Sequence, residues 1–160
     1  MRVLAVFGVL LLTACGAGAA TAKATPTPSP SPTPDVGALY SDAIGKTFGY
    51  LQTDFATLDA AKPGSPAEAT AATHLSEDYK SFLDTLDRIA FPPGAANDLS
   101  ALKKSLVALQ IFWSNVSTDS TSYNNFVYTN LNDANNQAEL LLGHDVGVSL
   151  VISPFVSPTP

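Results

Sequence analysis

The feature that most constrains the fold of this chain is a series of four apolar stripes at the spacing of an α-helix. In the second and third stripes, apolar residues recur in alternating steps of three and four, which places them on one helical face. No convincing period-two alternation, as a half-buried strand requires, accompanies them. The sequence therefore predicts an all-α domain. Its four stripes are Val36, Tyr40, Ala43, Ile44, Thr47, Phe48, Leu51, Phe55 and Leu58; Ala72, Leu75, Tyr79, Phe82, Leu86 and Ile89; Leu99, Leu102, Leu106, Leu109, Trp113 and Val116; and Tyr123, Val127, Leu131, Ala134, Ala138 and Leu141.

Short turn signals separate the stripes and set the expected topology. Lys62-Pro63-Gly64 ends the first, and the Ser65–Glu68 segment has the capping-box pattern that begins a helix. Gly143 is the expected stop of the fourth. Because short loops make successive helices antiparallel neighbours, we expect an up-down-up-down four-helix bundle. A three-helix bundle with a loose fourth segment and a pair of dimerising hairpins remain alternatives.

The segments flanking this bundle have a different composition. Residues 23–34 begin with Lys-Ala and then alternate Thr or Ser with Pro, which favours an extended polyproline-II spacer. We therefore expect a disordered Pro-rich stalk over residues 15–34, the bundle over 35–152 and a disordered tail over 153–160. Within the bundle range, Val146–Ile152 is a short apolar run that is expected to pack under one end of the helices.

The N-terminus carries the most specific motif in the chain. Arg2 precedes ten apolar residues, and Leu12-Thr13-Ala14-Cys15 follows. This arrangement is typical of a secretory signal peptide, and the last four residues resemble the lipobox of bacterial lipoproteins. The resemblance covers about the first 15 residues. It implies a signal peptide over residues 1–14, cleavage between Ala14 and Cys15, and attachment of diacylglycerol and palmitate to Cys15.

A lipidated Cys15 predicts a protein held at the cell membrane on its extracytoplasmic face, because several acyl chains on one residue anchor a protein durably. Two alternatives remain open. Ala17-Gly18-Ala19 could serve as an ordinary cleavage site and yield a secreted protein. Residues 3–22 carry no charge and could remain as an uncleaved membrane anchor, although their second half is rich in Gly, Ala and Thr.

Charge and cysteine content exclude several function classes. The formal net charge is −6, and the densest basic run is Lys103-Lys104. Nucleic-acid binding is therefore disfavoured, because neutralising phosphates needs clustered Lys and Arg. The only cysteine is Cys15, so the chain forms no intramolecular disulfide, and lipidation removes thiol chemistry.

No catalytic signature is present in the sequence, and we expect no catalytic residue, cofactor or metal. The best candidate for a metal site is His74, which shares a helical face with Asp78 and lies near Glu77. A zinc site needs at least three protein ligands, and these residues alone are an incomplete set. His144 follows the expected stop of the fourth helix, where an imidazolium would favour the helix dipole.

The most unusual surface candidate lies on the fourth helix. Amide and phenol side chains recur there at partly helical spacing, and together they suit sugar or peptide recognition because they offer donors, acceptors and flat apolar surface. The alternative is a polar outer face without a ligand. The residues of this candidate ligand face are Tyr123, Asn124, Tyr128, Asn132 and Asn135.

These observations predict a membrane-anchored extracytoplasmic lipoprotein with a non-catalytic helical bundle. The expected role is binding or interaction, with an envelope protein, a glycan or a small solute as partner and the membrane engaged through the Cys15 lipid. A structural surface protein without a specific ligand is the main alternative. A metal-dependent sensor or enzyme using His74 is a further one.

Overall fold

The computed structural model describes residues 35–151, of which none forms a strand. Four α-helices follow one another: α1 (Val36–Ala60), α2 (Pro66–Leu86), α3 (Ala96–Thr118) and α4 (Asn125–Asp145). Two short 3₁₀ helices, η1 (Pro93–Ala95) and η2 (Ser120–Ser122), precede α3 and α4. The all-α class and the four predicted helices are confirmed. The predicted signal peptide, stalk and 153–160 tail lie outside the described residues.

Polar caps begin three of the helices. Asp35 accepts hydrogen bonds from the backbone N–H groups of Gly37 and Ala38 at the start of α1. Ser65 accepts one from Glu68 at 3.3 Å, as the capping box predicts, while the Glu68 carboxylate accepts from Gly64 instead of Ser65. Asn124 caps α4 by accepting from Val127. These bonds satisfy N–H groups that the first helical turn leaves unpaired.

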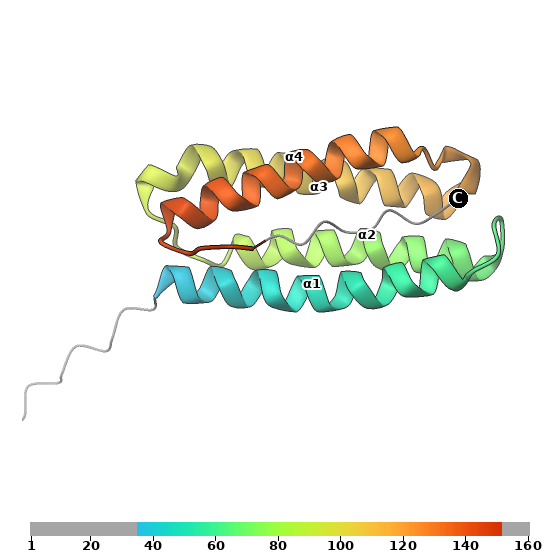
Figure 1. Cartoon of the computed structure of the whole chain (residues 1–160), viewed down its shortest axis with the longest axis horizontal. Coiled ribbons are helices and arrows are strands. Elements are labelled where there is room, and N and C mark those ends of the chain that lie inside the picture. The colour runs from blue at the N-terminus through green and yellow to red at the C-terminus, as the bar shows by residue number, and fades with distance from the viewer. Residues whose placement is uncertain (1–34, 152–160) are drawn as a thin grey trace, which may run out of the picture. The chain divides into compact units, whose positions relative to one another are not determined.

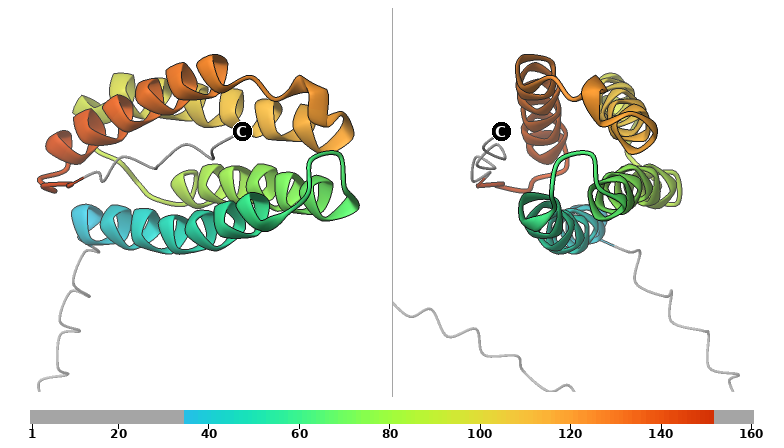
Figure 2. Two further views of the ribbon diagram at one scale, coloured as in Figure 1. Left: turned by 45° about the vertical axis from the view of Figure 1, so that its right-hand side comes forward. Right: turned by 90° about the vertical axis from the view of Figure 1, so that its right-hand side faces the viewer.

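The helices form an up-down-up-down bundle in which α1 lies beside α2, α2 beside α3 and α3 beside α4 (Figure 1, Figure 2). These three neighbouring pairs pack extensively. The fourth pair that would close a symmetrical bundle is different, because the backbones of α1 and α4 approach each other closely at few points. The bundle is therefore open along one of its four sides.

The core is mostly apolar and follows the predicted stripes of α2 and α3. Trp113 is fully buried and makes an edge-to-face contact with Phe55, with ring centroids 5.5 Å apart. Tyr128 adds a third ring, 5.3 Å from Trp113. This aromatic cluster joins α1, α3 and α4 at one level of the bundle. The leucines buried with it are Leu75, Leu86, Leu102, Leu106, Leu109 and Leu142.

The buried face of α4 differs from the predicted one by about one residue, or 100° of rotation. Val127 and Leu141 are exposed, and Tyr128 and Leu142 are buried in their place, whereas Ala138 is buried and Leu131 packs on the core as predicted. Tyr128 contributes a large ring to the aromatic cluster, so its burial outweighs that of Val127. Because α4 is one rigid element, this rotation also turns amide side chains of the same face inward.

The end of α4 differs from the prediction as well. Gly143 lies inside the helix, and the chain turns instead at Gly147, whose φ of +76° favours glycine. The following residues return alongside α4, held by a 2.8 Å hydrogen bond from Val148 N to Gly143 O. A Cβ on Gly143 would lie 3.0 Å from Leu150. Gly143 thus leaves room for the close approach of this returning segment, whose Val146 and Leu150 pack on the core as expected.

Candidate functional site

The open side of the bundle contains a groove of about 260 Å³ between α1 and α4. Its floor is apolar, since Tyr79 and Phe82 of α2 are almost completely buried beneath it. One wall comes from α1 and the other from α4, and the returning C-terminal segment lies at one end. The groove is lined by Ile44, Gly45, Thr47, Phe48, Leu51, Tyr79, Phe82, Asn132, Asn135, Asn136, Glu139, Leu150 and Val151.

The α4 wall is a row of hydrogen-bonding groups. Asn135 Nδ2 donates to Glu139 Oε1 at 2.7 Å, and Ser105 Oγ of α3 lies 2.9 Å from Asn135 Oδ1, positioned to donate to it. Asn132 is largely buried, yet its amide makes no hydrogen bond to another described residue. Because Asn132 lines the groove, its amide is available to hydrogen-bond water or a ligand there. The wall can therefore both donate to and accept from a bound molecule.

The titratable groups at the groove favour their neutral forms. Burial raises the pKa of Glu139 to about 7, although the hydrogen bond from Asn135 opposes the shift. Burial also raises the pKa of Tyr79 well above its ordinary value, with Tyr128 and Glu139 adding to the effect. The Tyr40 hydroxyl donates to the backbone oxygen of Glu139 at 3.1 Å, which ties α1 to α4 at this end. A neutral ligand suits such a groove better than an anion.

The structure divides the candidate ligand face of α4 among three environments. Asn132 and Asn135 lie in the groove wall. Tyr128 is buried in the aromatic cluster, and Tyr123 packs partly buried against Phe112 at its edge. Asn124 is exposed and caps the helix. The five residues therefore do not form one surface, and only the two central asparagines line the groove.

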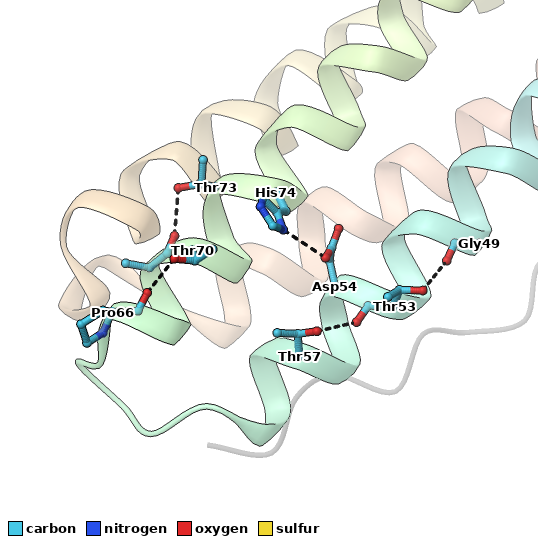
Figure 3. A network of polar contacts seen from close by, with 9 residues as sticks. Gly49, Thr53, Asp54, Thr57, Pro66, Thr70, Thr73 and His74 are labelled. Carbon is cyan, nitrogen blue, oxygen red and sulfur yellow. Dashed lines mark hydrogen bonds and ion pairs between the residues drawn. The ribbon is translucent and has the colours of Figure 1, made fainter.

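His74 of α2 does not line the groove, and it pairs with Asp54 of α1 (Figure 3). Its Nδ1 is 3.4 Å from Asp54 Oδ1, and the imidazole is about half exposed. Burial, with the neighbouring Asp54 carboxyl adding to the effect, raises the pKa of Asp78 to about 7. Two carboxyl groups that lie close together cannot both ionise freely, so this part of the α1–α2 contact favours a protonated Asp78. Glu77 adds a weaker charge effect.

Among residues 35–151, no group of three or more His, Cys, Asp or Glu side chains is arranged to hold a metal ion. His144 lies in the last turn of α4, where it is strongly exposed and 4.0 Å from Asp145. In the same part of the chain, no helix is long and apolar enough to cross a membrane.

Sequence reasoning did not find the groove, because its key residues carry weak signals. From the sequence alone, Glu139 is predicted to be an ordinary charged residue on the outer face of a helix. Gly45 and Gly49, which have a spacing that marks close helix crossings in membranes, each have open space around them. The signal that could have revealed the groove is the density of asparagines on α4, which places amides on every face of that helix. No protein-family model, curated protein or solved structure matches this chain.

Proposed function

We propose that the protein is a membrane-anchored extracytoplasmic lipoprotein whose helical bundle is a non-catalytic binding module, and that the groove between α1 and α4 is its binding site. The single observation that carries the binding role is the row of partly unpaired amides above an apolar floor. Apolar floors with a few placed polar groups are typical of ligand sites. The lipobox-like segment ending at Cys15 supports the anchoring.

The ligand class follows from the same residues. The walls offer amide donors and acceptors, and Glu139 offers a carboxyl group whose raised pKa favours its neutral form below about pH 7. The floor offers aromatic and aliphatic surface. A neutral, elongated molecule with carbonyl or hydroxyl groups along an apolar body fits this combination. An uncharged segment of an envelope protein and a glycan both belong to this class.

Anchoring is tested by replacing the lipidated residue. In bacteria expressing the full chain, we expect an alkyne palmitate analogue to label the wild-type protein, which sediments with membranes. Cys15→Ser is expected to lose the label and leave the membrane fraction, with an unchanged circular dichroism spectrum. Membrane retention of unlabelled Cys15→Ser would instead indicate an uncleaved anchor, and release of the wild type would indicate ordinary secretion.

Binding in the groove is tested by filling it. Gly45→Trp places a large side chain into the open space of the groove, whereas Gly94→Trp adds the same ring in open space outside it. Uncharged peptides and oligosaccharides are titrated against both variants and the parent by calorimetry. We expect Gly45→Trp to weaken binding at least tenfold and Gly94→Trp to leave it unchanged. Equal binding to all three proteins would contradict the assignment of the groove.

A further inference from the structure

The returning segment after α4 determines where the rest of the chain begins. After the turn at Gly147, Val148 packs on Gly37 of α1, where an added Cβ would lie 3.1 Å from its side chain. Leu150 packs on Gly143 of α4. The described part of the segment thus lies between the two helices at the end of the bundle where α4 stops (Figure 1). Leu150 and Val151 already line the groove.

The residues that follow have the right length to continue along the groove. Residues 152–160 in an extended polyproline-II conformation span about 28 Å at about 3.1 Å per residue. On the α4 wall, Gly143 and Asn132 are eleven residues apart, or about 17 Å along the helix. A chain starting from Val151 therefore reaches every amide of the groove without strain.

The chemistry of residues 152–160 matches the groove. They read Ile-Ser-Pro-Phe-Val-Ser-Pro-Thr-Pro and carry no charged side chain, as suits a groove that favours neutral groups. Their apolar side chains, Ile152, Phe155 and Val156, suit the apolar floor. Their prolines favour an extended backbone whose carbonyl groups have no internal partner, and such segments dock in grooves that combine aromatic surface with hydrogen-bond donors. The amides of Asn132 and Asn136 are donors of that kind.

We propose that residues 152–160 dock in the groove between α1 and α4 of the same molecule, so that an external ligand must displace them. The attachment at Val151 makes this docking intramolecular. Short flexible connections give effective concentrations in the millimolar range, so a weak contact suffices to hold the segment in place. The competition with an external ligand rests on the proposed binding function, whereas the docking itself does not.

The docking is tested by disulfide trapping in the Cys15→Ser background, which removes the natural thiol. Gly45→Cys puts a thiol in the groove without a clash, and Ser157→Cys puts one in the docking segment. Ser81→Cys, on the exposed side of α2, replaces Gly45→Cys in the matched control. Because a disulfide needs Cα atoms within about 7 Å, trapping reports proximity. In dilute protein, we expect the groove pair to form an intramolecular disulfide at least ten times faster than the control pair.

Equal trapping rates for the two pairs would overturn the proposal. A disulfide that forms only between molecules, at a rate that rises with protein concentration, would also overturn it, since the occupant would then be a second copy. If Gly45→Cys does not fold, Asn136→Cys supplies the thiol from the α4 wall.

The competition is tested with Nile red, a neutral apolar dye, on the full chain and on a chain ending at Val151. We expect the shortened chain to enhance the dye fluorescence several-fold, and a synthetic peptide of residues 152–160 to reverse the enhancement. Unchanged fluorescence on shortening, with clear binding by both chains, would overturn the displacement and leave the groove as a binding site. Absence of binding by either chain would contradict the proposed function as well, while the disulfide rates would still decide the docking.

Discussion

The α2–α3 pair and the α1–α4 pair are both antiparallel neighbours in one bundle, yet they are built from different side chains. Between α2 and α3 the buried residues are leucines and aromatics such as Leu75, Phe82 and Leu106. Between α1 and α4 the corresponding positions on α4 are Asn132, Asn135 and Glu139. Each buried leucine stabilises the fold by about 1.5–3 kcal/mol. A buried amide destabilises the fold unless a hydrogen-bond partner offsets the cost of removing it from water. The apolar α2–α3 pair therefore packs closely, whereas the amide-lined α1–α4 pair remains apart around a groove.

The largest expected contrast between the two regions is in their response to the same truncation. Leu106→Ala removes a fully buried side chain and is expected to lower the free energy of unfolding by about 3 kcal/mol. Leu51→Ala acts on a groove wall that can relax, so we expect a loss of about 1–2 kcal/mol. Urea unfolding followed by circular dichroism measures both. Equal losses would indicate that the α1–α4 side is packed as tightly as the rest.

A second contrast is in the response to pH. The pKa values of Glu139 and Asp78 are raised to about 7 in the folded chain, so the folded state binds more protons than the unfolded state between about pH 4 and pH 7. Stability from these groups is therefore fully present below about pH 4 and is lost as pH rises through about 7. We expect a loss on the order of 1–2 kcal/mol per group, after allowing for solvent screening.

The measurement is the melting temperature at pH 5 and pH 8. Glu139→Gln and Asp78→Asn keep the side-chain shape without the titration, so each is expected to reduce the difference between the two temperatures. Asp42→Asn, at an exposed position of α1, is the matched control and should leave the difference unchanged. A parent protein that is more stable at pH 8 than at pH 5 would contradict this sign.

The smallest expected effects come from two glycines that lie on the two helices of the open side. Gly45 has open space around it, so Gly45→Ala is expected to stabilise the protein by about 0.5–1 kcal/mol through helix propensity. In Gly143→Ala the new methyl group meets Leu150 and the backbone oxygen of Val148. We expect no net stabilisation there, and faster amide exchange in the returning segment by mass spectrometry. Similar stabilisation by both substitutions would show that the segment does not need Gly143.

Much of the fold was predictable from local patterns. The stripes of α2 and α3 consist mostly of Leu and aromatic residues at regular helical spacing, so each helix has one face that is clearly the more apolar. The Ser65 cap and the Pro63-Gly64 break also act locally, so they were predicted correctly. On α4 the stripe was ambiguous, because Val127 and Tyr128 are neighbours and either could point inward. The choice depended on Trp113 and Phe55, which are distant in sequence.

The candidate site was less predictable for the same reason. The sequence placed Asn132 and Asn135 on one candidate ligand face, but it grouped them with Tyr128, which the aromatic cluster buries. Glu139 gains its raised pKa only from the burial that α1 and the returning segment create. The pairing of Asp54 with Asp78 likewise requires α1 and α2 to pack in one particular register.

The sequence by itself determined four amphipathic helices, their order and their short connections, because helical periodicity, caps and turns are properties of residues close together in the chain. Only the tertiary structure decided which face of α4 turns inward and that α1 and α4 stay apart. That decision depends on comparing the burial of large rings and the desolvation of amides across the whole bundle, and these energies arise only when distant segments pack together.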